Sequence, residues 1–329
     1  MEYVKCNLCG FDDAKLILRA RSRITNDGKK YFKLVKCERC NLVYLNPRPE
    51  KGEIKKYYPP WYHSRAQEKV TDITKTKLWG IPWREAMRNK AEPILRYKKK
   101  GRILDIGCGD GSLLKFLKDS GWQTYGVELQ DSSSLYARDV LGLNVFSGRF
   151  DEANYPQNSF DVITLFHVLE HLPDPSGTIK KARMLLRKDG LLFIEVPNFN
   201  SFEAKIFKSK WVGISAPLHL YHFTPRTLQM ILKSCGLIPV EVGFIPEQTK
   251  YMAGYSESLR YCLMDLGLYP SGPKGKGLEE KKGEESNSSS SSWIGSLHHL
   301  EYLIFYGVAY FMDKIGKGLN LLVVARRRS

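Results

Sequence analysis

The chain has 329 residues, of which 43% are hydrophobic and 26% are charged, and its formal net charge is +16. This composition is that of a globular protein and excludes extensive disorder, and the length suffices for one large domain and a small accessory module. The positive charge suits acidic partners such as nucleic acid, anionic lipid or phosphorylated substrates, but a lysine-rich surface exposed to solvent explains it equally well.

Two further features bear on location. Residues 1–10 lack the basic segment and apolar run of a secretory signal. The longest apolar stretch, residues 300–312, contains Glu301 and is shorter than the ~20 residues that a bilayer crossing needs. We therefore expect a cytoplasmic protein whose thiols are reduced.

Four of the seven cysteines lie near the start of the chain as two close pairs, Cys6 with Cys9 and Cys37 with Cys40. Each pair can present two thiolates from one turn, and two such turns complete a tetrahedral zinc site. Because protein would fill all four positions, this Zn²⁺ would be structural, and its binding would fold residues 1–60 as a zinc-ribbon-like module. A zinc ribbon can equally contact nucleic acid.

Residues 61–90 are expected to form a linker or helical cap, and residues 91–248 alternate between strand and helix patterns. Short apolar or β-branched runs are typical of buried strands, and helical patterns separate most of them. This alternation predicts a mainly parallel sheet with helices on both faces. Thr224-Pro225 predicts a helix start, with an N-cap followed by proline, and that helix ends near Gly236. The expected strands are residues 102–106, 122–128, 143–147, 160–166, 191–196 and 237–244.

The first of these strands runs into the glycine-rich segment Gly107–Gly111, which reads GCGDG. The glycines allow a tight turn close to a ligand, and the helix expected from Ser112 offers unpaired N–H groups at its start. The glycine spacing differs from the Gly-x-Gly-x-x-Gly of nicotinamide-cofactor sites, and the Asp105 carboxylate suits a cationic aminoacyl group. Glu128 ends the next strand, where an acidic side chain can accept the protons of ribose hydroxyls.

Polar side chains follow the strand at residues 160–166. If this segment forms one helical turn, His167, Glu170 and His171 share a face, because their spacing is i, i+3 and i+4. His219 and His222 come shortly before the predicted helix at residue 224. Three interpretations stay open: a histidine acts as general base on a substrate hydroxyl, a His/Glu set binds a second divalent metal that polarises this hydroxyl, or the histidines are structural.

The rest of the chain is expected to form a helical insertion, residues 249–316, followed by a final strand and basic tail, residues 317–329. Residues 270–292 are rich in Ser, Lys, Glu and Gly and predict a flexible loop. Residues 294–315 have the pattern of a helix with a broad apolar face. We expect this helix to pack against the domain or to form a lid over the acceptor site; the alternative is a helix on an anionic membrane surface, which would make the protein peripheral to the membrane.

At the glycine-rich loop and Glu128 the sequence resembles the class I S-adenosylmethionine-dependent methyltransferase family, over residues 90–245 and the final strand. The resemblance implies an α/β fold with a Rossmann-like seven-stranded sheet whose last strand is antiparallel, here with the zinc-ribbon module before it and the helical insertion before the last strand. It also implies S-adenosylmethionine as cofactor and an adenine site near Phe150 and Asp151. The cofactor-binding candidates are Asp105, Gly107, Cys108, Gly109, Glu128, Leu129, Phe150, Asp151 and Phe166.

The polar residues after the fourth strand follow an order that resembles the ubiquinone-biosynthesis O-methyltransferases and the small-RNA 2′-O-methyltransferases. Some of these enzymes hold a divalent metal on Glu-x-x-Glu-His and a later His, and here His167 stands in the place of the first Glu. The N-terminal module is similar to zinc ribbons that precede methyltransferase domains in bacterial sugar-modifying and cell-surface polysaccharide enzymes. The catalytic candidates are His167, Glu170, His171, His219 and His222, and the metal candidates are Cys6, Cys9, Cys37 and Cys40.

These resemblances imply an enzyme that methylates a hydroxyl of a sugar, a glycan precursor or a similar small metabolite. One alternative is an RNA methyltransferase that uses the basic surface. A second is a zinc-dependent binding protein that has the fold without the activity.

Overall fold

The structure is a computed structural model that describes residues 1–22, 30–50, 52–57, 77–78, 81–244, 258–263, 265–266, 311–312 and 314–328. Within these ranges every helix is too short or too polar to span a lipid bilayer. Residues 61–76 of the expected linker, the predicted loop at residues 270–292 and most of the predicted helix at residues 294–315 lie outside them. The membrane-surface alternative for that helix therefore stays a prediction.

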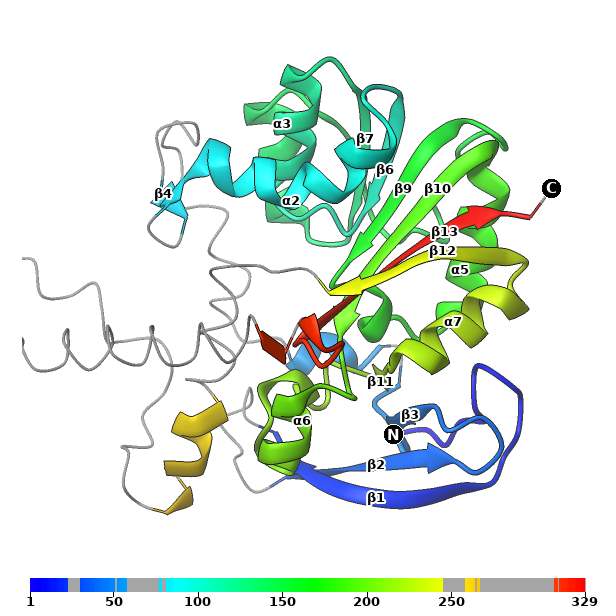
Figure 1. The fold of residues 1–329 in the computed structure, drawn as a ribbon, viewed down its shortest axis with the longest axis vertical. Coiled ribbons are helices and arrows are strands. Elements are labelled where there is room, and N and C mark those ends of the chain that lie inside the picture. Colours follow the sequence, from blue (N-terminus) through cyan, green and yellow to red (C-terminus); the bar gives the residue numbers. More distant parts are fainter. Residues whose placement is uncertain are drawn as a thin grey trace, which may run out of the picture.

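A seven-stranded sheet forms the centre of the molecule, in the order β12-β13-β10-β9-β6-β7-β8 (Figure 1). The strands β8, β7, β6, β9 and β10 are parallel, and β13 runs antiparallel between β10 and β12. This confirms the predicted sheet and its antiparallel last strand. The strands are β6 (Arg102–Ile106), β7 (Gln123–Glu128), β8 (Asn144–Ser147), β9 (Phe160–Phe166), β10 (Leu186–Pro197), β12 (Leu237–Phe244) and β13 (Asn320–Arg327).

One strand begins earlier than its sequence pattern predicts. β10 starts at Leu186, which pairs with Phe160 of β9, and the register shifts before Leu191 pairs with Val162. The intervening residues 187–189 are exposed and charged, and residue 190 is glycine, so they show none of the apolar pattern of a buried strand. The predicted start at residue 191 marks where β10 enters the core.

Helices cover both faces of the sheet. Because successive side chains of a strand point to opposite faces, neighbouring strand residues belong to two different hydrophobic cores. Ile103, Val162 and Phe193 belong to one core together with residues of α2 and α3. Leu104 and Ile163 belong to the other core together with residues of α5 and α7. The helices are α2 (Trp83–Tyr97), α3 (Ser112–Asp119), α4 (Asp131–Leu135), α5 (Pro175–Leu185), α6 (Phe202–Phe207) and α7 (Pro225–Ser234), with η3 (Tyr136–Val140) after α4.

The predicted start of the helix after residue 224 agrees with the structure. The Thr224 side chain accepts a hydrogen bond from the Thr227 backbone N–H, and Pro225 is the first residue of α7. The last residue of α7 is Ser234, and Gly236 follows with a φ of +78°, a backbone conformation that favours glycine.

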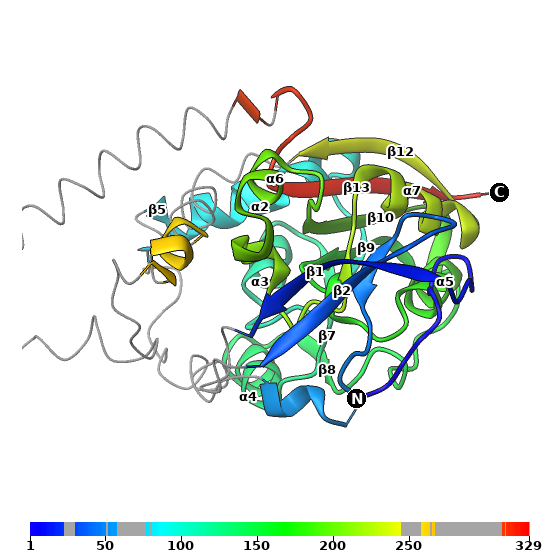
Figure 2. The ribbon, with the colours of Figure 1, turned by 90° about the horizontal axis from the view of Figure 1, so that it is seen from below.

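A second, four-stranded sheet contains the first part of the chain, in the order β1-β2-β3-β11. Its strands are β1 (Ala14–Arg21), β2 (Tyr31–Cys37), β3 (Val43–Leu45) and β11 (Tyr221–His222). We call residues 1–50 the four-cysteine module. The fourth strand of its sheet is supplied by the central domain, and the module shares a hydrophobic core with the α5 and α7 side of the large sheet. Figures 1 and 2 show the small sheet beside the large one.

The remaining elements are short. They are η1 (Ile54–Tyr57), the two-stranded pair β4 (Lys77–Leu78) and β5 (Ile81–Pro82), η4 (Leu169–His171), η5 (Lys208–Lys210) and η6 (Val212–Ile214).

Candidate functional site

The glycine-rich loop turns sharply between β6 and α3. Gly107, Gly109 and Gly111 have φ values of +74°, +57° and +78°, which side chains other than glycine rarely adopt. A Cβ atom at Gly107 would lie 2.4 Å from Cγ2 of Val168. Glycine is therefore needed at Gly107 both for the turn and for the close contact with the segment that follows β9.

The Glu128 carboxylate is held beside this loop by backbone groups. Its Oε2 accepts a hydrogen bond from the Gly109 N–H at 2.8 Å, and its Oε1 accepts one from the Gln130 N–H at 2.8 Å. Because β6 and β7 are adjacent and parallel, Glu128 and the loop lie at the same end of the sheet. Each carboxylate oxygen keeps a lone pair, so Glu128 is oriented for a ligand with two neighbouring hydroxyls.

Asp105 is buried at the end of β6, with 4% of its surface exposed. Burial raises its pKa to about 6, although nearby Lys90 and a hydrogen bond from Thr164 oppose this shift. The Thr164 hydroxyl donates to Oδ1 of Asp105 at 2.6 Å, and the Lys90 ammonium lies 5.7 Å from the centre of the Phe166 ring. Lys90 and Thr164 were missed in the sequence; the only signal was a hydroxyl within the apolar run of β9.

The other cofactor candidates surround the same strand ends. Phe166 is buried at the end of β9, and Leu129 is exposed directly after Glu128. Cys108 is half-buried, and burial raises the pKa of its thiol well above the usual range. This thiol is therefore protonated and lines the turn as a small apolar group.

A lysine that sequence patterns did not reveal supports the loop after β8. The Lys181 ammonium donates hydrogen bonds to the backbone carbonyls of Phe150, Asp151 and Ala153, at 2.6, 3.0 and 2.7 Å. Both oxygens of the Asp151 carboxylate accept hydrogen bonds from Arg149 at the surface. The Phe150 ring is buried, and Lys181 therefore fixes the backbone of the predicted adenine loop.

Beyond β9 the structure brings together three polar residues from two distant segments. One oxygen of Glu170 and one ring nitrogen each of His171 and His219 all lie within 4.8 Å of one another. Both carboxylate oxygens of Glu170 are buried and accept no hydrogen bond from any described residue.

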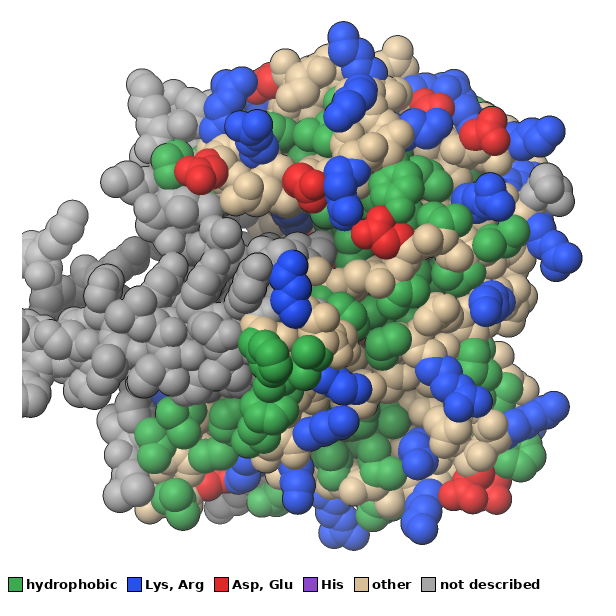
Figure 3. Space-filling view, viewed as in Figure 1, with side chains coloured by type: hydrophobic (Ala, Val, Ile, Leu, Met, Phe, Trp, Pro, Cys, Tyr) green, Lys and Arg blue, Asp and Glu red, His purple; other side chains and the backbone are tan. Residues whose placement is uncertain are grey.

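On the face seen in Figure 3 no described histidine is visible, and Lys and Arg side chains are spread over it rather than gathered on one element.

Both histidines of this cluster are oriented by backbone carbonyls. Nδ1 of His171 lies 3.1 Å from the Leu218 carbonyl oxygen, and Nδ1 of His219 lies 2.8 Å from that of Gly213. Burial lowers the pKa of His171 to about 4 and that of His219 to about 3, so both rings are neutral. A neutral ring that donates from Nδ1 carries its lone pair on Nε2, and this is the arrangement in which protein histidines hold metals or accept protons.

His167 and His222 lie beside the cluster. The short helical turn begins only at Leu169, and His167 precedes it with a φ of +58°, so the i, i+3, i+4 face expected from the sequence does not form. His167 lies instead between two buried carboxylates, 2.9 Å from Glu195 and 3.6 Å from Glu170.

The other flanking histidine, His222, contacts a carbonyl as well. Its Nε2 lies 3.2 Å from the Ile214 carbonyl oxygen, and its ring centre lies 6.5 Å from that of His219. Burial lowers its pKa to about 4. Glu195, the partner of His167, was missed in the sequence, where the only signal was one acidic residue within the apolar run of β10.

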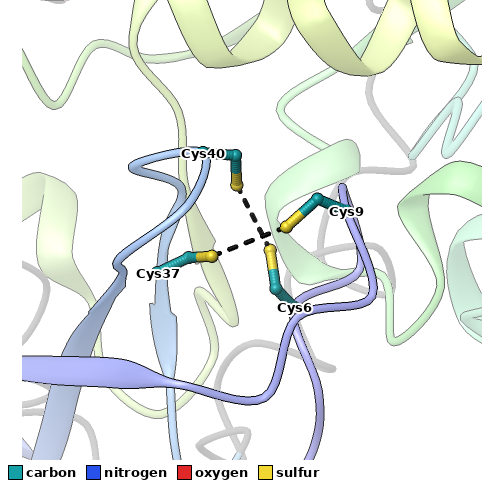
Figure 4. Close-up of side chains that lie close together, drawn as sticks. All are labelled: Cys6, Cys9, Cys37 and Cys40. Atoms are coloured by element: carbon teal, nitrogen blue, oxygen red, sulfur yellow. Dashed lines mark hydrogen bonds between the residues drawn. The ribbon is translucent and has the colours of Figure 1, made fainter.

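The four cysteines converge as their spacing predicts (Figure 4). Sγ of Cys6 lies 3.4 Å from that of Cys40, and Sγ of Cys9 lies 3.6 Å from that of Cys37. All four sulfurs lie within 4.8 Å of one another. Zinc–sulfur bonds of ~2.3 Å in a tetrahedron place sulfurs ~3.8 Å apart, so the residues fit a zinc ion.

The two turns that present the cysteines have the same construction. The Gly10 N–H donates to the Cys6 carbonyl and the Asn41 N–H donates to the Cys37 carbonyl, at 2.8 and 3.0 Å. Gly10 and Asn41 both have left-handed backbone, with φ values of +71° and +64°. Burial raises the pKa of Cys6 to about 11, so this sulfur becomes a thiolate at neutral pH only if a cation compensates its charge.

Comparison with known proteins places the central domain. Residues 83–242 match a family model described as a methyltransferase domain. A ubiquinone biosynthesis O-methyltransferase from Idiomarina loihiensis is 33% identical over 134 residues, which are 38% of this chain and 51% of that protein. The corresponding enzyme from Nitrosospira multiformis is 26% identical over 181 residues, covering 49% of this chain and 74% of that protein. The chain thus spans about half the length of the first of these relatives.

Solved structures show a more distant likeness. A methyltransferase from Archaeoglobus fulgidus, described as S-adenosylmethionine-dependent, is 20% identical with a TM-score of 0.45, covering 74% of this chain and 94% of its own. The 1,6-didemethyltoxoflavin-N1-methyltransferase of Burkholderia thailandensis is 14% identical with a TM-score of 0.48, covering 93% and 98%. The family match and the strand order of the sheet together show that the central domain of this chain belongs to the class I S-adenosylmethionine-dependent methyltransferases.

Proposed function

We propose that this protein binds S-adenosylmethionine and transfers its methyl group to a hydroxyl of a sugar, a glycan precursor or a similar small metabolite. The observation that carries the proposal is the position of the Glu170–His171–His219 cluster next to the glycine-rich loop Gly107–Gly111, which we call the cofactor loop. Val168, between the cluster and β9, packs directly against Gly107. The relatives named as O-methyltransferases support oxygen as the methylated atom.

On the cofactor side, the residues suit a nucleoside with an aminoacyl chain. Glu128 would accept hydrogen bonds from both ribose hydroxyls, and Asp105 would pair with the ammonium of the aminoacyl group. The backbone around Phe150, which Lys181 holds, would contact the adenine. When bound, S-adenosylmethionine supplies a methyl carbon that its sulfonium makes electrophilic, so the protein must align an oxygen with it and weaken the bond to the hydroxyl proton.

On the acceptor side, the buried Glu170 carboxylate, which accepts no hydrogen bond from a described residue, favours a divalent cation over a histidine base alone. Two buried carboxylate oxygens without a hydrogen bond are costly, and a cation held by Glu170, His171 and His219 would satisfy them. Two neutral imidazoles and a carboxylate are suitable ligands for such an ion. The cation would polarise the acceptor hydroxyl, and His167, fixed by Glu195, would lie beside it as a proton acceptor.

The four-cysteine site would hold Zn²⁺ in a structural role. Its four sulfurs would fill a tetrahedral coordination shell, which leaves no position for substrate. The acceptor chemistry therefore belongs to the Glu170–His171–His219 cluster.

Cation binding at the cluster can be tested without knowing the acceptor. We expect zinc-loaded protein to bind Mn²⁺ in calorimetry and electron paramagnetic resonance. Glu170→Gln and His171→Ala should abolish this binding and leave the affinity for S-adenosylhomocysteine within about twofold, because Asp105 and Glu128, which would hold the cofactor, are not among the three cluster residues. Glu85→Gln, which changes an exposed carboxylate on α2, is the matched control. Unchanged Mn²⁺ binding in both cluster variants, or none in the parent, would exclude the cation and leave a histidine base.

The acceptor class needs a second experiment. Protein incubated with S-adenosylmethionine carrying a labelled methyl group is offered nucleotide sugars, isolated glycan precursors, phenolic metabolites and RNA. We expect label in a hydroxylated small molecule, with an O-methyl signal in its NMR spectrum and loss of turnover in His171→Ala. Label confined to RNA, or an N-methyl or C-methyl product, would contradict the proposal.

A further inference from the structure

Arg48 is a buried cation of the four-cysteine module that contacts the central domain. Only 8% of its surface is exposed. Its Nε donates to the Glu2 carboxylate at 2.8 Å, and its Nη1 donates to the Pro173 carbonyl and to the Tyr221 hydroxyl, both at 2.9 Å. The Tyr221 hydroxyl in turn donates to the Pro173 carbonyl at 3.2 Å. One guanidinium thus joins three segments that are distant in sequence.

The partners of Arg48 lie close in sequence to the two histidines of the Glu170–His171–His219 cluster. Pro173 lies two residues after His171, and Tyr221 lies two residues after His219. Arg48 therefore holds, at equivalent positions, both segments that supply histidines to the Glu170–His171–His219 cluster. A planar guanidinium with several fixed donors is suited to such a role, because it sets the distance and the angle between two acceptors.

Backbone hydrogen bonds connect the module to the same cluster. β11 pairs with β3, with Tyr221 opposite Tyr44 and His222 opposite Val43. The Leu45 N–H donates to the Leu220 carbonyl at 2.9 Å, and the Leu220 N–H donates to the Glu170 carbonyl at 2.8 Å. A continuous chain of two hydrogen bonds therefore runs from β3 of the module to Glu170.

The first cysteine turn makes a third connection. Asn7, which lies between Cys6 and Cys9, accepts a hydrogen bond from the Ser176 N–H at 2.9 Å and donates one to Asp174 at 2.9 Å. Asp174 is the N-cap of α5, so the metal-binding turn docks on the segment that directly follows η4 and its His171.

We propose that Arg48 is a positioning residue for the Glu170–His171–His219 cluster, through which the fold of the four-cysteine module controls the geometry of the acceptor site. The catalytic meaning of this cluster rests on the proposed function, but the structural coupling does not. The module is then a part of the active-site framework as well as a folding unit.

The test uses the full chain loaded with a single equivalent of Zn²⁺ and labelled with ¹⁵N in its histidine rings. In the parent, we expect His171 and His219 to show the Nδ1–H tautomer. In Arg48→Ala, their ring signals should shift or broaden, and Mn²⁺ affinity should fall about tenfold or more, the usual effect of removing a group that orients metal ligands. S-adenosylhomocysteine affinity should stay within about twofold, because Arg48 contacts no cofactor candidate.

Two further variants keep the test decisive. Tyr221→Phe removes only the hydroxyl that Arg48 contacts, and it should move the same two signals by a smaller amount; it replaces Arg48→Ala if that variant does not fold. Arg19→Ala, an exposed arginine on β1 of the same module, should leave the signals unchanged.

The failures of the two proposals are distinguishable. The positioning role would be overturned if a folded Arg48→Ala or Tyr221→Phe variant had the same His171 and His219 ring signals as the parent. A parent that binds neither Mn²⁺ nor S-adenosylhomocysteine would instead refute the proposed function, and the ring signals would still decide the role of Arg48.

Discussion

The cofactor loop and the Glu170–His171–His219 cluster lie next to each other but are assembled differently. Around the loop, the Glu128 carboxylate accepts hydrogen bonds from Gly109 and Gln130, and these groups come from two consecutive strands and their turns. The cluster combines η4 with a segment almost fifty positions further along the chain. That second segment pairs with a strand of the four-cysteine module.

This difference indicates which parts of the protein each half depends on. The glycine-rich loop contacts groups at or just after the ends of the neighbouring strands β7 and β9, and the other cofactor candidates are supported by side chains of α2 and α5; none of these contacts involves the four-cysteine module. The cluster needs the large sheet, α5 and the four-cysteine module together. Damage to the module should therefore affect the acceptor side more than the cofactor side. Four predictions test this difference or the cofactor half by itself, from the largest expected effect to the smallest.

Replacing a cysteine of the proposed zinc site should have the largest effect. We expect Cys40→Ser to lose bound zinc, because three sulfurs remain, and to unfold the module locally, since structural zinc contributes on the order of 10 kcal/mol to folding of small modules. Metal analysis and thermal unfolding measure this, with Cys262→Ser as the control. The comparison breaks down if the variant loses S-adenosylhomocysteine binding as completely as it loses zinc.

Glu128→Ala should remove most of the cofactor affinity. Hydrogen bonds from ligand hydroxyls to a carboxylate contribute about 1.5–3 kcal/mol each, so we expect a loss of roughly 100-fold for S-adenosylhomocysteine in calorimetry. Mn²⁺ binding should be unchanged, because Glu128 accepts hydrogen bonds from Gly109 and Gln130 and is not one of the three cluster residues. Equal cofactor affinity in Glu128→Ala would refute the assignment of this half of the site.

The raised pKa of Asp105 leads us to expect that cofactor binding depends on pH. This pKa is about 6 in the fold, above the ordinary 3.8, because burial disfavours the carboxylate. The contribution of Asp105 to the free energy of unfolding is therefore present below pH ~4 and is lost as pH rises through about 6. The ionised form attracts an ammonium, so S-adenosylhomocysteine should bind about tenfold more weakly at pH 5 than above the pKa. Asp105→Asn should flatten this profile, and an unchanged profile would exclude Asp105 as its cause.

The smallest effect is expected at Lys181. Lys181→Ala removes three hydrogen bonds to the backbone of the loop around Phe150 but no direct ligand contact. We expect about threefold weaker S-adenosylhomocysteine binding, which corresponds to ~0.6 kcal/mol, with the neighbouring Lys180→Ala as control. A loss as large as that of Glu128→Ala would mean that Lys181 contacts the cofactor itself.

The ease of prediction follows the same division. The strands of the large sheet, the glycine turn and the cysteine turns could be read from the sequence, because each depends on local spacing, burial pattern or backbone conformation. Thr164, Lys90, Lys181, Glu195 and Arg48 could not, because each acts through a partner more than twenty residues away. His167 was expected on a helical face, but its left-handed backbone turns the chain before η4 begins.

The sequence by itself determined the family of the central domain and the convergence of four sulfurs, since short-range spacing specifies a strand, a turn and a pair of thiols. Only the tertiary structure decided which histidines meet Glu170 and showed that the strand carrying His222 completes the sheet of the four-cysteine module. The physical reason is that pairing between distant strands and the burial of a charged group such as Arg48 depend on the whole packed core, and no local pattern of residues records them.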